Sequence, residues 1–124
     1  ASRELARACR PALQKSIEIK DPEFKFRMWD KVVDKMRYDI LNLNAWIKDA
    51  SMDLMQFTNK RDYFGKELYQ RDVFMDRQKN KWMIEWSNKD LAWVAYNMDN
   101  NDMRLLHTFS AVKKIGNLYE GFEE

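Results

Sequence analysis

Apolar residues recur at alternating steps of three and four positions through the first half of the chain. The positions of this stripe are Phe26, Trp29, Val33, Met36, Ile40, Leu43, Ile47, Ala50, Leu54 and Phe57. Such spacing is typical of an α-helix that buries a narrow seam against another helix. Asp21 and Pro22, which precede the stripe, suit the N-cap and the first position of a helix. The pattern therefore predicts one long amphipathic helix over about residues 22–57.

A helix of that length would measure roughly 50 Å, whereas a compact domain of this chain length would be roughly 35 Å across. The phase of the stripe continues unchanged through Asn42 and Asn44, so we expect a straight helix that runs past its own domain and is covered by a partner. The seam residues predicted to bind that partner are Trp29, Val33, Met36, Ile40, Leu43, Ile47, Leu54 and Phe57. The alternative is an ordinary three- or four-helix bundle that contains one long helix.

The rest of the sequence predicts two to three further helices, over about residues 62–86, 87–98 and 102–115. The chain has only 3 glycines and 2 prolines, and a sheet protein needs turn residues at short intervals. This scarcity favours an all-α fold of elongated shape. The predicted organisation is a basic amphipathic arm over residues 1–20, a helical domain over residues 21–116 and a tail over residues 117–124.

The N-terminal arm combines a four-residue apolar repeat with arginines on another face, and Pro11 interrupts it. A basic start rich in Arg and Ala is typical of a mitochondrial transit peptide, although Glu4 departs from that pattern. Two other interpretations stay open: an arm that docks on an acidic partner or on lipid headgroups, and the first helix of the bundle. The longest apolar run, residues 91–96, is far too short for a transmembrane helix, so we expect no membrane span.

Candidate metal ligands are few. The chain has one cysteine, Cys9, and one histidine, His107, so it cannot supply the four Cys or His ligands of a structural zinc site. The acidic stretch Asp99–Asp102 lacks the glycine and the distal glutamate of a calcium-binding loop. No glycine-rich phosphate loop occurs. We therefore expect neither a metal nor a cofactor.

Catalytic candidates are equally sparse. Glu85 lies between Trp82 and Trp86, and burial among them would raise the pKa of its carboxyl group. On a helix, however, Glu85 can face water while the two tryptophans pack inward. We therefore expect no enzymatic activity, and a small helical enzyme that uses His107 and Glu85 remains an alternative.

Nucleic acid is a weaker candidate partner. Residues 71–82 bring basic side chains and Trp82 together, a combination that can meet phosphates and stack on bases. Acidic residues interrupt the same stretch, and the net charge of the whole chain is only +2. A nucleic-acid binder usually has a more basic face. The sequence therefore disfavours nucleic acid as a partner without excluding it.

The aromatic and Met residues exceed what one small core needs, and surplus apolar side chains usually mark partner surfaces. We therefore expect a non-catalytic accessory subunit that packs by helix–helix contacts against other protein subunits of a larger assembly. The Arg- and Ala-rich start favours an intracellular, mitochondrial location, such as a respiratory complex or ATP synthase. The alternative is an RNA- or ribosome-associated helical protein.

Overall fold

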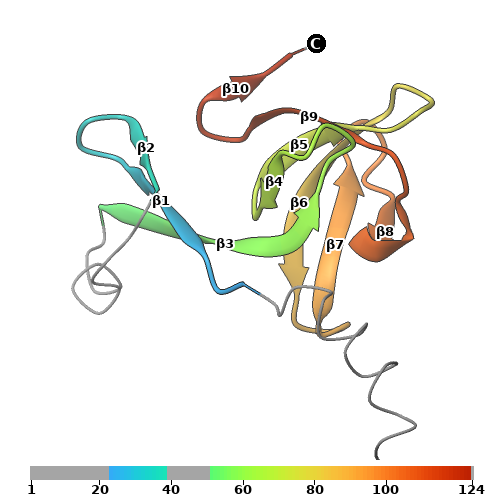
Figure 1. Cartoon of the computed structure of the whole chain (residues 1–124), viewed down its shortest axis with the longest axis horizontal. Helices are drawn as coiled ribbons and strands as arrows, with labels where there is room; N and C mark the ends of the chain where they lie inside the picture. The colour runs from blue at the N-terminus through green and yellow to red at the C-terminus, as the bar shows by residue number, and fades with distance from the viewer. Residues whose placement is uncertain (1–22, 39–50, 124) are drawn as a thin grey trace, which may run out of the picture.

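The chain is built from β-strands. A computed structural model describes residues 23–38 and 51–123, and within these ranges the regular elements are ten strands and one short 3-10 turn (Figure 1). The strands are β1 (Phe26–Asp30), β2 (Lys35–Arg37), β3 (Met52–Arg61), β4 (Glu67–Tyr69), β5 (Asp72–Met75), β6 (Lys81–Ser87), β7 (Ala92–Asn97), β8 (Met103–Leu105), β9 (Lys113–Asn117) and β10 (Gly121–Phe122). The 3-10 turn η1 (Leu106–Thr108) follows β8. The predicted all-α fold is therefore wrong, for the long helix and for the further helices alike.

The strands form two antiparallel sheets. The smaller sheet has the order β2-β1-β3-β4, and the larger has the order β10-β9-β5-β6-β7-β8. In Figure 1 the long strand β3 runs from the β1–β2 hairpin to the body of the molecule, where the larger sheet curls into a half-barrel. The chain passes from the smaller sheet to the larger one between β4 and β5.

The segment predicted as a helix instead folds back on itself. Trp29 lies opposite Met36 in the β1–β2 hairpin, and β3 returns along β1 with Leu54 opposite Met28. Val33 is 56% exposed in the turn between β1 and β2. The steps of three and four therefore combined strand residues with turn residues, and they did not mark one helical face. Residues 39–50, which include several predicted seam positions, lie outside the described part of the chain.

Polar side chains build the hairpin turns by accepting backbone N–H groups. In the β5–β6 turn, for example, Asp76 Oδ1 accepts the N–H groups of Gln78 and Asn80, both at 2.9 Å. This arrangement fixes the chain reversal without glycine or proline. The residues that open turns in this way are Asp30, Asp62, Asp76, Ser87, Asn97 and Asn117.

The turns also place residues other than glycine in the left-handed backbone region, which side chains disfavour. These residues are Asp34, Asn59, Arg71, Lys79, Leu91 and Asn101. One of the glycines is required for space, because a Cβ atom on Gly116 would lie 2.5 Å from the Cα atom of Phe122 in the paired strand β10. The scarcity of glycine and proline therefore reflects how these turns are made, and it did not indicate helices.

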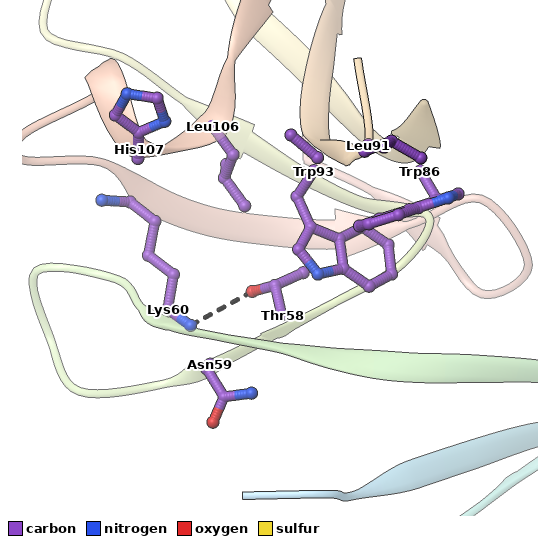
Figure 2. A pocket seen from close by; sticks show the side chains of 9 residues that line it. Thr58, Asn59, Lys60, Trp86, Leu91, Trp93, Leu106 and His107 are labelled. Atoms are coloured by element: carbon purple, nitrogen blue, oxygen red, sulfur yellow. Dashed lines mark hydrogen bonds between the residues drawn. The ribbon is translucent and has the colours of Figure 1, made fainter. Parts of the chain in front are cut away.

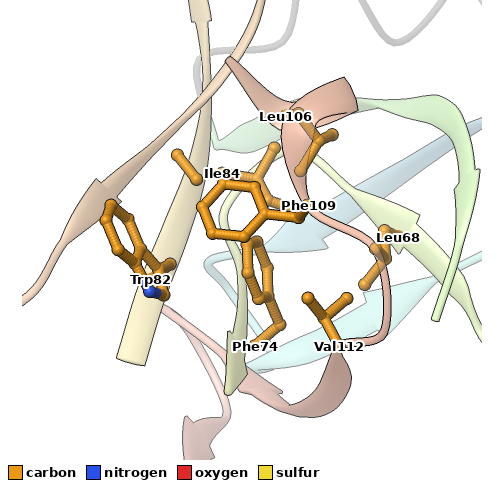
Figure 3. Close-up of a cluster of buried hydrophobic side chains, with 8 residues drawn as sticks. Leu68, Phe74, Trp82, Ile84, Leu106, Phe109 and Val112 are labelled. Carbon is orange, nitrogen blue, oxygen red and sulfur yellow. The ribbon is translucent and has the colours of Figure 1, made fainter. Parts of the chain in front are cut away.

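The larger sheet curls around one apolar cluster (Figure 3). The buried members are Leu68, Phe74, Trp82, Ile84, Ala95, Leu106, Phe109 and Val112. Phe109 lies at the centre, with its ring centroid 4.9 Å from that of Phe74 and 5.0 Å from that of Trp82, both edge to face. Since Phe109 follows η1, the segment between β8 and β9 closes the open side of the half-barrel.

A buried ion pair, with a third charged group beside it, joins the two sheets. Arg27 of β1 and Asp72 of β5 both have side chains with no solvent exposure, and Arg27 Nη2 lies 2.8 Å from Asp72 Oδ1. Asp72 Oδ2 accepts the N–H of Tyr69 at 2.7 Å and lies 3.1 Å from the Lys114 ammonium. The Arg27 guanidinium also covers the face of the Tyr69 ring, 4.8 Å from its centroid. One buried carboxylate therefore faces two cations, and removing it would leave both without an ion-pair partner among the described residues.

Tyr69 should make the fold sensitive to alkali. Burial, and then the charge of Glu67, raises the pKa of the Tyr69 hydroxyl to about 12. Because this pKa exceeds the unfolded value of roughly 10, the contribution of the neutral hydroxyl to stability is intact below pH ~10 and is lost as the pH rises to ~12. We expect the free energy of unfolding of the wild-type protein to fall by on the order of 2 kcal/mol relative to Tyr69→Phe across that window.

Urea unfolding of both proteins at several pH values measures this difference. Lysines and the other tyrosines titrate in both proteins, so their effects cancel in the comparison. A difference that does not change between pH ~9 and ~12 would contradict the prediction.

Candidate functional site

A surface hollow lies between β3 and the β6–β7 hairpin, with η1 at one end (Figure 2). Its volume is about 460 Å³, which is within the range of ligand-binding pockets. The residues that line it are Thr58, Asn59, Lys60, Trp86, Leu91, Ala92, Trp93, Leu106 and His107. We call this hollow the Trp86–Trp93 groove.

Two tryptophans form the aromatic wall of the groove. Trp86 and Trp93 lie opposite each other on β6 and β7, and their rings meet edge to face with centroids 5.3 Å apart. The Trp86 indole N–H donates to Asn88 Oδ1 at 2.9 Å, which fixes that ring. The Trp93 indole N–H has no hydrogen-bond acceptor among the residues that the structure describes. Trp93 can therefore offer a donor to a ligand.

Polar groups of β3 form the opposite wall, and their positions are fixed. The strand has a register irregularity between Phe57 and Arg61, and Asn59 within it takes a left-handed conformation. The Thr58 hydroxyl donates to the carbonyl of Leu68 at 2.7 Å. The Lys60 ammonium donates to the carbonyl of Phe109 at 2.8 Å, which holds it at the groove. Its other two N–H groups have no acceptor among the described residues.

The groove suits an apolar group that carries a hydrogen-bond acceptor or a negative charge. Trp86, Leu91, Trp93 and Leu106 supply apolar surface, and none of the described lining residues is acidic. The charge of Lys60 is therefore not neutralised within the lining.

Leu91 combines two unfavourable features. Its side chain is 75% exposed, and its φ of 50° lies in the left-handed region, which costs a residue such as leucine roughly 1–2 kcal/mol. Neither feature helps the isolated chain to fold. Strain of this kind is often found at functional sites, and here it presents an apolar side chain at the rim of the groove.

A second polar cluster surrounds Tyr119 in the β9–β10 turn, away from the groove. The Tyr119 ring stacks on Trp29, with centroids 5.3 Å apart, and its hydroxyl donates to Asp53 at 2.9 Å and accepts a hydrogen bond from Arg71. Arg71 in turn pairs with Glu85 at 3.3 Å. The cluster ties β1 and β3 of the smaller sheet to β6 of the larger sheet through the β4–β5 and β9–β10 turns, so we assign it a structural role.

The same contacts shift two pKa values. Burial raises the pKa of the Tyr119 hydroxyl, and its hydrogen bond to Asp53 raises it further. Burial alone would raise the pKa of Asp53, but hydrogen bonds from Tyr119 and Lys31 outweigh it and the pKa is lowered. Both shifts keep the phenol protonated and the carboxyl ionised at neutral pH, which is the state that holds the cluster together.

The predicted seam residues that the structure describes do not line the groove and do not share one stripe. Phe57 is fully buried and Met36 nearly so, whereas Val33 is exposed. Trp29 and Leu54 are half-buried in β1 and β3. Three seam residues lie outside the described part of the chain: Ile40, Leu43 and Ile47. The helical seam is wrong, and contact between these residues and a partner stays a prediction.

The two residues of the predicted catalytic alternative, His107 and Glu85, do not lie in one site. His107 lies on η1 at the groove, whereas Glu85 of β6 pairs with Arg71 in the Tyr119 cluster. Cys9 lies outside the described residues. In residues 23–38 and 51–123, no group of three or more His, Cys, Asp or Glu side chains could hold a metal ion. The described part also contains no helix long and apolar enough to cross a membrane.

Residues 40–123 match the family described as YopX protein, over more than half of the chain. The chain belongs to the YopX family. No curated protein matches it. The matched region covers β3 to β10, so the Trp86–Trp93 groove lies wholly within the YopX domain.

This membership and the β-rich fold overturn the expected function. The prediction of a helical subunit of a respiratory complex or ATP synthase is wrong for this YopX-family chain, because the described residues form strands where its helices were expected. The RNA- or ribosome-associated alternative also assumed a helical protein and is withdrawn with it. The intracellular, mitochondrial location is not tested by the fold and stays a prediction.

Proposed function

We propose that this YopX-family protein is a non-catalytic binding module that holds an apolar side chain of a partner polypeptide in the Trp86–Trp93 groove. The observation that carries the proposal is the lining, which has two tryptophans and two leucines facing Lys60 and no described acid. Such a wall favours an aliphatic or aromatic anchor, and the ammonium favours a carbonyl or carboxylate beside it.

The exposure of the groove supports a polypeptide over a small molecule. Small-molecule sites usually enclose most of their ligand, whereas Trp86 is 42% and Leu91 75% exposed at the rim. A polypeptide that inserts one side chain can cover that rim with its own surface. Protein partners were also expected from the sequence, although by packing of helices.

Replacing Leu91 with glycine tests the proposal, because stability and binding should change in opposite directions. Glycine takes the left-handed conformation without strain, so we expect Leu91→Gly to unfold at the same free energy as the wild type or up to about 1 kcal/mol higher. Removal of the exposed side chain should weaken binding of groove-directed peptides at least tenfold, about 1.4 kcal/mol.

The matched control is Lys79→Gly. Lys79 has a similar left-handed φ of 65° in the β5–β6 turn but does not line the groove. The peptides would be selected from a random library on the wild-type protein, and their dissociation constants measured by calorimetry on all three proteins. We expect an apolar residue beside an acidic one in the selected peptides. Peptides that bind Leu91→Gly as tightly as Lys79→Gly would refute the proposal.

A further inference from the structure

A smaller hollow beside the β5–β6 turn has a different chemistry. Its volume is about 270 Å³, and it shares no lining residue with the Trp86–Trp93 groove. Two arginines line it, Arg77 from the turn and Arg104 from β8, together with Ser110 and Ala111 of the segment after η1. Its lining is therefore rich in hydrogen-bond donors.

The donors of this hollow are available. Among the residues that the structure describes, neither Arg77 nor Arg104 has a carboxylate within ion-pairing distance. The Ser110 hydroxyl and the backbone N–H groups of Ser110 and Ala111 likewise have no acceptor within the described ranges. Donors left open in this way are the groups that an oxyanion needs.

One acidic residue, Asp76, also lines the hollow, but its oxygens are turned to other donors. Oδ1 accepts the backbone N–H groups of Gln78 and Asn80 at 2.9 Å. Oδ2 accepts the indole N–H of Trp82 at 3.0 Å. Both Asp76 oxygens therefore already accept hydrogen bonds, from the turn and from the core. With two arginines and one aspartate, the lining has a net positive charge.

Arg104 is held in place before any ligand arrives. Its guanidinium lies over the ring of Trp82, 5.2 Å from the centroid, and Trp82 is only 1% exposed and packs against Phe109. A cation–π contact of this kind uses none of the guanidinium N–H groups in a hydrogen bond, so they stay available to a ligand. A positioned arginine of this kind can bind two oxygens of one tetrahedral anion side by side.

We infer that this hollow is an oxyanion site that takes a phosphate group, with Arg104 as the fixed ligand, Arg77 as the second cation and Ser110 as a hydroxyl donor. The volume exceeds that of a phosphate group alone, so a phosphate ester can place its carrier in the remaining space. The site is independent of the Trp86–Trp93 groove, and failure of either proposal leaves the other intact.

Titration with inorganic phosphate, followed by two-dimensional ¹H–¹⁵N NMR, tests the site. We expect saturable shifts of the Ser110 and Ala111 amide signals, against a chloride titration at equal ionic strength that leaves them unchanged. A parallel titration with adenosine 5′-monophosphate separates the sources of the group. Tighter binding of the ester identifies an esterified ligand, whereas equal or weaker binding identifies free phosphate.

Two arginine variants and one control variant make the test specific. We expect Arg104→Gln and Arg77→Gln each to weaken phosphate binding at least tenfold, and Lys89→Gln, which removes a charge from the β6–β7 turn, to leave it unchanged. Arg77 makes no ion pair or hydrogen bond with a described residue, so its variant keeps the test valid if Arg104→Gln disturbs the fold. Shifts that chloride reproduces, or binding that survives both arginine substitutions, would overturn the inference.

Discussion

Replacement of Asp72 by asparagine is expected to destabilise the fold by about 3–5 kcal/mol, the cost of breaking a buried ion pair. The new side chain has nearly the same shape, so the effect is one of charge. It leaves Arg27, which has no exposed side-chain surface, and the largely buried Lys114 without their carboxylate. Because small domains have only 5–15 kcal/mol of stability in total, much of it would be lost. Urea unfolding followed by tryptophan fluorescence measures the change.

Two further variants test whether the effect of Asp72→Asn comes from the unpaired charges. Adding Arg27→Met to Asp72→Asn should recover part of the loss, because it removes one of the two unpaired cations. Glu123→Gln, which breaks the exposed contact of Glu123 with Lys113 at 3.9 Å, should change stability by less than about 0.5 kcal/mol. If Asp72→Asn costs no more than Glu123→Gln, the cluster does not hold the sheets together.

Replacement of Phe109 by alanine is expected to cost about 3–5 kcal/mol, as for other buried phenylalanines. Phe109 is 8% exposed and is the ring on which the edge-to-face contacts with Phe74 and Trp82 converge (Figure 3). Since these contacts come from strands that already pair with each other, the core cannot close the cavity without moving the sheet. Thermal and urea unfolding of the variant measure the loss.

Phe109→Leu separates the volume of the side chain from its aromatic contacts. It keeps most of the apolar volume and should cost clearly less than alanine. The backbone carbonyl of Phe109, which accepts from Lys60, remains in both variants, so neither removes that tether directly. A loss below about 1 kcal/mol for alanine would show that the segment after η1 is not a necessary part of the core.

The β-fold could be predicted from some segments of the sequence but not from others. In β6, Trp82 and Ile84 are buried and alternate with half-buried Met83 and Glu85, which is the period of two typical of a strand. In β1, by contrast, the buried set includes Arg27 and Asp30, which hydropathy assigns to the surface. These buried charged residues break the alternation of apolar and polar positions in β1. The segment was therefore predicted as a helix from its three- and four-residue spacing.

The polar residues that open the turns also indicated a β-fold. Asp76, Ser87 and Asn97 follow one another at intervals of about ten residues, the spacing of hairpins in an all-β domain. Each accepts the backbone N–H groups that reverse the chain. Counting glycine and proline missed them, because an Asx turn achieves the reversal with an ordinary polar residue.

The candidate sites could not be predicted from sequence because each draws on segments that only the fold brings together. The Trp86–Trp93 groove combines residues 58–60, 86, 91–93 and 106–107. Their nearness depends on the irregularity in β3 and on the placement of η1. The individual tryptophans were visible in the sequence, but nothing local showed that Trp86 stays partly exposed while Trp82 is buried.

The strand order sets a sequence of events for folding. Hairpins join every neighbouring pair of strands in the larger sheet except β5 and β9, which are far apart in the chain. Hairpins form quickly because their ends are close, whereas bringing β9 to β5 costs the entropy of closing a long loop. A nascent or truncated chain that ends before Lys113 therefore carries β5 as an open edge, with backbone groups available to another chain. Aggregation during synthesis should depend on how soon the last strands follow.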